Sequence, residues 1–283
     1  MRRVRIRNFK SKAAREGNIR AVAPAPLLSK FASEALASLT NVEGGAPVTW
    51  SIIARDDATG QIGIAVATRF FAVGARVPHI APGIGGVATQ ALVNPYYGID
   101  GVRLLREGRS AQDVVSILVA GDEGRESRQL HVIDAKGRIA AFTGKDCIDW
   151  CGHLAGDGFS VAGNMLVGAA ALDETAKTYV ANAGLSFARR LIAAMRAGEA
   201  AGGDKRGKQS AALLIHEGEE WSALDLRVDD HADPLAELER LERVSRERWV
   251  HFRKYLPTRK NPAGITDRAT IDAGIEAGIA GET

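Results

Sequence analysis

The chain has 283 residues, of which 46% are hydrophobic and 25% charged, as is typical of a globular protein with a sizeable core. Its formal net charge of +3 arises in residues 1–48, which hold nine Lys or Arg and three acidic residues. The basic residues of the remainder are scattered among acidic ones, so we expect no nucleic-acid partner. The sequence contains no run of 18 apolar residues and no apolar core of a secretion signal. We therefore expect a cytoplasmic protein that neither crosses nor binds a membrane.

Residues 1–48 are basic at the start, show neither helical nor strand periodicity, and end in the turn-forming run E-G-G-A-P before Val48. We interpret them as a flexible or misannotated N-terminal extension. Valine can be encoded by GTG, which bacteria also use as a start codon. If translation begins at this codon, the protein starts at position 48 and residues 1–47 are misannotated. A leader that is removed by processing, such as a transit peptide, and a retained tail are the alternatives.

From Thr49 onwards short β-rich runs alternate with helical patterns. Ser110 is expected to cap one of the helices, and Gly198 to end another. Helices are predicted over 101–108, 111–120, 169–182, 185–197 and 234–255. Strands are predicted over 49–56, 61–69, 75–80, 84–92, 129–134, 139–144, 159–166, 210–216 and 223–228.

Runs of strands that alternate with helix pairs predict an α/β (α+β) fold with two stacked antiparallel sheets and helices on both outer faces, a four-layer αββα sandwich. We assign this domain to residues 49–255. Residues 256–283 are expected to form a loosely attached C-terminal tail with a weak helix. The helix over 234–255 is amphipathic and packs either on its own sheet or on a second copy, which makes a homodimer a hypothesis; its apolar residues include Leu235, Leu238, Leu241 and Trp249.

The two cysteines, Cys147 and Cys151, are four residues apart in C-I-D-W-C. On a helix this spacing holds the Cα atoms at the upper limit for a disulfide, so we expect two reduced thiols. His153 would add a third metal ligand, but tetrahedral zinc sites generally show a second pair of ligands, and none follows. We therefore predict no metal and no other cofactor. Cys147 as a nucleophile is a weak alternative.

Several motifs resemble one family of bacterial proteins. They include T-W-S-I-I-A-R-D, G-V-A-T-Q-A-L-V-N-P-Y-Y-G, A-G-N-M-L and D-L-R-V-D-D-H-A-D-P. The sequence from 49 to about 245 is similar to the domain of unknown function 1028, which is placed in the N-terminal-nucleophile (Ntn) hydrolase superfamily. The motifs are specific for the family but not for a reaction. Members typically begin Met-Thr-Phe-Ser-Ile, so the resemblance implies that Thr49 is exposed when an initiator Met at position 48 is removed.

An N-terminal threonine carries its own base, because its α-amine has a pKa of about 7.7–8.0. The resemblance therefore implies an amidohydrolase in which the Thr49 hydroxyl attacks a small amide, lactam or ureido compound. If Thr49 is instead an ordinary strand residue, the alternative is a non-catalytic small-ligand-binding or structural protein on the same fold.

The similarity to proteasome-like relatives implies that polar residues after the second strand lie beside Thr49, and by spacing these are Thr68, Arg69 and His79. Arg69 would bind a substrate carboxylate, or form a surface salt bridge. His79 is equally compatible with an ordinary buried histidine.

Amide side chains are the candidates for stabilising an oxyanion: Gln90, Asn94 and Asn164. Asn94 has the alternative role of capping a helix that begins at Pro95.

Two polar segments near the end of the domain are harder to assign. Asp204, Lys205, Arg206 and Lys208 would line the mouth of a site for a charged substrate or a subunit contact, and a solvated turn is the alternative. The cluster from Asp225 to Asp233 contains several acidic residues, but it lacks the spacing of a calcium loop. We expect Asp233 to cap the following helix.

Overall fold

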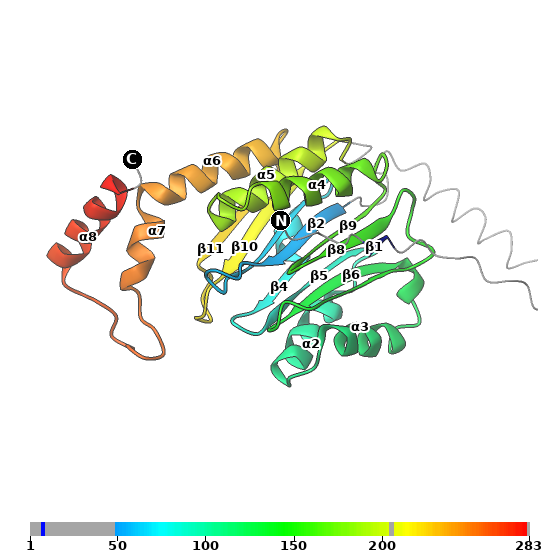
Figure 1. Ribbon diagram of the computed structural model, residues 1–283, viewed down its shortest axis with the longest axis horizontal. Helices are drawn as coiled ribbons and strands as arrows, with labels where there is room; N and C mark the ends of the chain where they lie inside the picture. Colours follow the sequence, from blue (N-terminus) through cyan, green and yellow to red (C-terminus); the bar gives the residue numbers. More distant parts are fainter. Residues whose placement is uncertain (1–6, 9–48, 204–206, 282–283) are drawn as a thin grey trace, which may run out of the picture. The chain divides into compact units, whose positions relative to one another are not determined.

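The computed structural model describes residues 7–8, 49–203 and 207–281. They form a mixed α/β unit in which two antiparallel sheets face each other and helices cover the outer face of each sheet (Figure 1). In these described ranges, no helix is both long and apolar enough to cross a membrane.

The larger sheet, sheet A, places the first strand of the domain at its centre. Its strands in spatial order are β1 (Arg7–Asn8), β8 (Gly152–Gly156), β9 (Phe159–Asn164), β2 (Thr49–Arg55), β3 (Ile62–Thr68), β10 (Ser210–His216) and β11 (Leu224–Val228). The strands predicted for this sheet are confirmed. Two of its strands were not predicted: β8, because G-H-L-A-G lacks β-branched residues, and β1, which pairs with β8 although it lies in the segment interpreted as a flexible or misannotated extension.

The smaller sheet, sheet B, contains β4 (Pro78–Ala81), β5 (Gly85–Ala91), β6 (Arg128–Asp134) and β7 (Ile139–Thr143) in chain order. The strand predicted over 75–80 begins three residues late, because a 3₁₀ turn, η1 (Val73–Ala75), precedes it. Pro78 is tolerated because it opens an edge strand, where its missing N–H costs no ladder hydrogen bond.

The helices divide between the two sheets. Sheet B is covered by α2 (Pro95–Arg106) and α3 (Ala111–Ala120), and sheet A by α4 (Ala170–Ala181), α5 (Phe187–Ala200) and α6 (Pro234–Glu247). A short 3₁₀ turn, η2 (Arg125–Ser127), leads into β6. The predicted N-terminal caps are confirmed, since Asn94, Ser110 and Asp233 each accept a backbone N–H of the helix that follows. The prediction that Gly198 ends a helix is wrong: it is buried inside α5, which continues to Ala200, and a side chain there would collide with Thr175 of α4.

The prediction of one continuous helix over 234–255 is wrong. Arg248 leaves the helical region with φ −152°, and the chain continues as α7 (Trp249–Phe252) and the 3₁₀ turn η3 (Arg253–Tyr255). Leu235 and Leu238 of α6 are fully buried in the core over sheet A, so this helix packs on its own sheet.

The C-terminal segment contains α8 (Arg268–Ala280), which confirms the expected helix. It lies against α7 and buries Ile275. A side chain at Gly274 would collide with the Tyr255 hydroxyl, so glycine is what permits this close approach.

The layer between the two sheets changes character along β2. Successive side chains of a strand point to opposite faces, so Trp50 and Ile52 enter the core beneath the helices, whereas Thr49, Ser51 and Ile53 face sheet B. Around Ile53 the layer is aliphatic. At the Thr49 end it is polar, and this change positions the candidate site.

Candidate functional site

Thr49 opens the central strand of sheet A and lies between two predicted site residues. It pairs with Thr68 of β3 on one side and with Asn164 of β9 on the other. All three residues are buried. Because antiparallel pairing sets the start of β2 beside the ends of its neighbours, the fold brings together three polar residues that are far apart in the sequence.

Hydroxyl and amide groups make the contacts of Thr49. Its Oγ1 donates to Thr68 Oγ1 at 3.2 Å. Its carbonyl oxygen accepts from Asn164 Nδ2 at 3.3 Å and from Gln90 Nε2, on sheet B, at 3.4 Å. The two amides expected to stabilise an oxyanion are therefore bonded to the backbone of Thr49, and they hold the residue in place.

Gln129 on β6 is the centre of this network, and the sequence analysis did not single it out. Its side chain is fully buried. Its Oε1 accepts from Gln90 Nε2 at 2.8 Å and from Asn164 Nδ2 at 3.1 Å. Its Nε2 lies within hydrogen-bond distance of three acceptors: Thr143 Oγ1 at 2.9 Å, Gly152 O at 3.0 Å and Gly163 O at 2.9 Å. Gln129 thereby links the side-chain amides of Gln90 and Asn164 to strands of both sheets through hydrogen bonds.

A buried histidine extends the network one step further along β2. Ser51 Oγ donates to Gln90 Oε1 at 2.6 Å and lies 2.9 Å from His131 Nε2, while His131 Nδ1 lies 3.1 Å from Ser160 Oγ. Burial lowers the pKa of His131 to about 3, and the charge of His153 acts in the same direction. His131 is therefore neutral near pH 7.

A pocket of about 390 Å³ opens beside Thr49, within the range of small-molecule sites. Its polar lining residues are Thr49, Thr68, Arg76 and Gln90. The rest of its lining is mainly apolar and includes Phe70 and Leu92, whose side chains are 46% and 60% exposed. The pocket thus lies between buried polar residues that include Thr49 and an apolar, solvent-accessible rim.

The backbone around this pocket holds three non-glycine residues in the left-handed region: Ala72 with φ 54°, Ala91 with φ 66° and Met165 with φ 53°. Ala91 lines the pocket, and Met165 follows Asn164 directly. Such conformations cost free energy and concentrate at functional sites. Their positions around Thr49 support this end of sheet A as the functional one.

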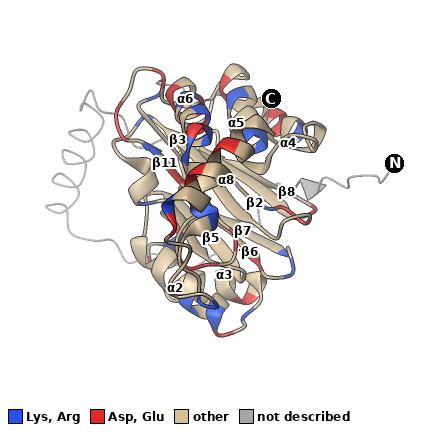
Figure 2. Cartoon of the chain, turned by 90° about the vertical axis from the view of Figure 1, so that its left-hand side faces the viewer, with Lys and Arg blue, Asp and Glu red and all other residues tan. Residues whose placement is uncertain are grey.

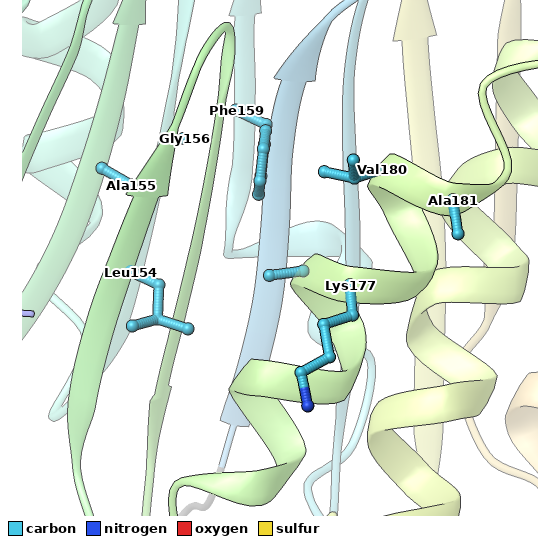
Figure 3. A pocket seen from close by; sticks show the side chains of 8 residues that line it. Leu154, Ala155, Gly156, Phe159, Lys177, Val180 and Ala181 are labelled. Atoms are coloured by element: carbon cyan, nitrogen blue, oxygen red, sulfur yellow. The ribbon is translucent and has the colours of Figure 1, made fainter. Parts of the chain in front are cut away.

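A second pocket, of about 280 Å³, lies between α4 and the strands β8 and β9 (Figure 3). Leu154, Phe159 and Val180 form most of its walls, and its one charged lining residue among those described, Lys177, pairs with Glu174 at 2.6 Å. It offers an apolar surface without a nucleophile or a convergent set of polar groups. It therefore has less catalytic potential than the Thr49 pocket.

The structure sets His79 and Asn94 apart from Thr49. His79 pairs with Val87, on the face of sheet B that α2 covers, and its ring packs against Gly98 of that helix. Burial lowers the pKa of His79. Asn94 caps α2, and its Nδ2 donates to Asp122 Oδ2 at 3.1 Å. His79 therefore occupies the position of an ordinary packed histidine, and Asn94 that of a helix cap, the alternatives given for them in the sequence analysis.

The remaining predicted residues lie in or near the loop before β10. Arg69 is exposed, directly after β3, with its guanidinium beside Gly207. Lys208 Nζ lies 2.8 Å from Glu199 Oε1 and 2.9 Å from Asp233 Oδ1, and its ammonium lowers the pKa of the Asp233 carboxyl. This pairing gives Lys208 a structural role. Three further residues lie outside the described ranges: Asp204, Lys205 and Arg206.

The surface charges are mixed in sign. Figure 2 shows basic and acidic residues interspersed along α6, while the strands carry few charges. In the acidic cluster, Asp229 pairs with Arg227 at 2.9 Å and Asp230 accepts from Gln209 Nε2 at 3.0 Å. Within the described residues, no group of three or more His, Cys, Asp or Glu side chains is arranged to hold a metal ion.

The cysteines are free thiols with poor nucleophilicity. Burial raises the pKa of Cys147 to about 11 and that of Cys151 to about 12. Since the thiolate is the reactive form, these values disfavour Cys147 as a nucleophile.

Comparisons with known proteins bear on the same part of the chain. The model of a family of unknown function, DUF1028, matches residues 49–238. A crystal structure of the protein SPO2555 from Silicibacter pomeroyi, assigned to DUF1028, is similar with a TM-score of 0.72 and 33% sequence identity. The similarity covers 78% of this chain and 96% of that one. No curated protein matches. The chain therefore belongs to the DUF1028 family.

Proposed function

We propose that this protein is an Ntn-type hydrolase of a small amide, lactam or ureido compound, with Thr49 as its N-terminal nucleophile. One observation carries the proposal: Thr49 lies at the start of the central strand of sheet A, its hydroxyl is hydrogen-bonded to Thr68, and the residue lines a pocket of about 390 Å³. The layering of two sheets between helices is consistent with the four-layer sandwich of that superfamily.

The chemistry requires a free α-amine on Thr49. The amine takes the hydroxyl proton as Oγ1 bonds to the substrate carbonyl carbon, and the C–N bond then breaks as the leaving nitrogen receives that proton. Water next attacks the resulting ester and gives one proton to the amine. The acid product leaves as Thr49 Oγ1 regains a proton, so the residue returns to its starting state.

In the 283-residue chain the Thr49 nitrogen belongs to the peptide bond with Val48. An amide nitrogen has no basic lone pair, so the proposal includes release of this amine, by translation from position 48 and Met removal or by cleavage. The experiment therefore compares two proteins: the full chain and a chain expressed as Met-Thr49 onwards, whose intact mass verifies that Met is lost and whose circular dichroism verifies folding.

Both proteins are assayed against a panel of small amides, lactams and ureido compounds by detection of the released amine. We expect turnover only by the Thr49-started chain, with loss in Thr49→Ala and partial retention in Thr49→Ser. Thr59→Ala, in an exposed turn, serves as the matched control. Equal turnover by Thr49→Ala, or by the full chain with Val48 attached, would overturn the proposal.

The alternative is a non-catalytic small-ligand-binding protein. The observation in its favour is that the Gln90 and Asn164 amides donate to the Thr49 carbonyl, which leaves them committed to structure and not to an oxyanion. Ligand binding without turnover by a verified Thr49-started chain would establish this function in place of hydrolysis.

A further inference from the structure

Arg76 contributes the electrostatic character of the Thr49 pocket. Among the described residues that line the pocket, it is the one with a charged side chain. It follows the 3₁₀ turn η1, and its Nη1 donates to Phe71 O at 3.2 Å and to Ala72 O at 3.5 Å. Its guanidinium lies 6.0 Å from the centroid of the Phe70 ring. These contacts position the side chain at the pocket without neutralising its charge.

A nearby arginine shows the contrast. Arg227 packs near Gly74 of the same turn and forms a 2.9 Å ion pair with Asp229. In the part of the chain that the structure describes, no such pair joins Arg76 to a carboxylate. A guanidinium keeps its charge at all physiological pH values and its fork of N–H donors matches a carboxylate. Arg76 therefore presents an anion-binding group to the contents of the pocket.

The other walls of the pocket favour apolar ligand surface. Val73, Val77, Leu92 and Val93 present hydrocarbon to the same space. Apolar surface of a ligand gains free energy when these side chains remove it from water, whereas a second charge on the ligand would have no partner among them. The complementary molecule has an apolar body and one anionic end.

We infer that the pocket binds small apolar carboxylates of the N-acyl amino acid class, with the carboxylate on Arg76, the apolar side chain on the aliphatic wall and the amide toward Thr49. The position of the amide rests on the proposed hydrolase function. Binding of the carboxylate does not, and this allows the two to be tested separately.

The test uses three pairs of probes: N-acetyl-L-leucine, N-acetyl-L-methionine and N-acetyl-L-phenylalanine, each with its neutral carboxamide. Calorimetric titration of the full chain carrying Thr49→Ala measures binding without turnover. For at least one pair we expect the affinity of the acid to exceed that of the carboxamide by about 10-fold or more. This ratio corresponds to the free energy of one charge-assisted hydrogen bond. Arg76→Gln removes this preference and Arg76→Lys retains part of it.

Arg109→Gln is the matched control, because Arg109 is exposed after α2 and does not line the pocket. It should leave every affinity unchanged. Equal binding of acid and carboxamide in all three pairs, or a preference that survives Arg76→Gln, would overturn the inference.

Turnover separates this inference from the proposed function. If acids bind in an Arg76-dependent manner but the Thr49-started chain hydrolyses none of them, the carboxylate site stands and the hydrolase proposal fails for this class. If that chain hydrolyses acids and carboxamides equally in a Thr49-dependent reaction, the hydrolase proposal stands and the role of Arg76 is refuted.

Discussion

Thr49 and Thr68 face each other at the first residue pair of β2 and β3, with their Oγ1 atoms 3.2 Å apart. Thr49 is the donor in this hydrogen bond. A neutral hydroxyl such as that of Thr68 is too weak a base to remove the proton of a nucleophile. Thr68 therefore orients Thr49 Oγ1, and in the proposed reaction it is a positioning residue.

This relationship predicts a selective effect of Thr68→Val. Valine has nearly the same shape but cannot accept the hydrogen bond, so we expect kcat of the Thr49-started chain to fall about 10-fold, the equivalent of one neutral hydrogen bond. KM should change little, and Thr68→Ser should retain most of the activity. Steady-state kinetics on the best substrate measures both values. Unchanged kcat in Thr68→Val would show that the contact has no role in the reaction.

The buried amide network predicts a large structural effect of Gln129→Leu. Leucine leaves the amide groups of Gln90 and Asn164 without their shared acceptor in the interior, and each unsatisfied buried group costs about 1–3 kcal/mol. We expect the free energy of unfolding to fall by about 3 kcal/mol or more, measured by urea denaturation. Gln112→Leu, on the exposed face of α3, is the control and should change stability by under about 0.5 kcal/mol. Equal effects of the two substitutions would contradict a structural role for Gln129.

Much of the fold follows from local sequence signals. The two runs before and after D-A-T-G form the β2–β3 hairpin, and the residues before two helices act as the caps they were expected to be, Ser110 and Asp233. Local hydrogen bonds of this kind depend on neighbours in the chain, so a single sequence is sufficient to predict them. The break at Arg248 and the strand β8 depend on packing against distant elements, which sequence periodicity does not report.

The candidate site was only partly predictable for the same reason. Thr49, Thr68, Gln90 and Asn164 were singled out and lie together. Gln129 and His131 were missed, although they are two residues apart on one strand and period two places both on one face. The polar alternation in Q-L-H-V was the available signal. His79 was assigned by spacing, but its pairing with Val87 directs it to the α2 side of sheet B.

The position of His79 leads to a prediction about packing. A side chain at Gly98 would collide with the imidazole of His79, so Gly98→Ala must displace α2 from β4. We expect it to lower the free energy of unfolding by about 1–3 kcal/mol, whereas Gly168→Ala, with open space around it, serves as the control. His79→Ala should restore stability to the Gly98→Ala chain, because the small side chain removes the collision. It should also leave the proposed turnover intact.

A double-mutant cycle with denaturant unfolding measures this coupling. Additive effects of the two substitutions would show that Gly98 and His79 do not constrain each other. Loss of turnover in His79→Ala, without loss of stability, would return His79 to the catalytic candidates.

His131 predicts how stability depends on pH. Its folded pKa of about 3 lies below the ordinary histidine value of about 6.5, so between these pH values the unfolded chain binds a proton that the folded chain does not. Folding therefore loses stability as pH falls below about 6.5, by about 1.4 kcal/mol per pH unit, and the loss levels off near the folded pKa. Urea denaturation at pH 7.5 and pH 5 should show that His131→Gln loses about 2 kcal/mol less than the parent chain between these conditions. Other histidines whose pKa is lowered by burial, such as His79 and His216, remain in both proteins and contribute equally. His231→Gln, at an exposed position, is the control and should lose as much stability between pH 7.5 and pH 5 as the parent chain. An equal loss in the parent and His131→Gln chains would rule out His131 as the titrating group.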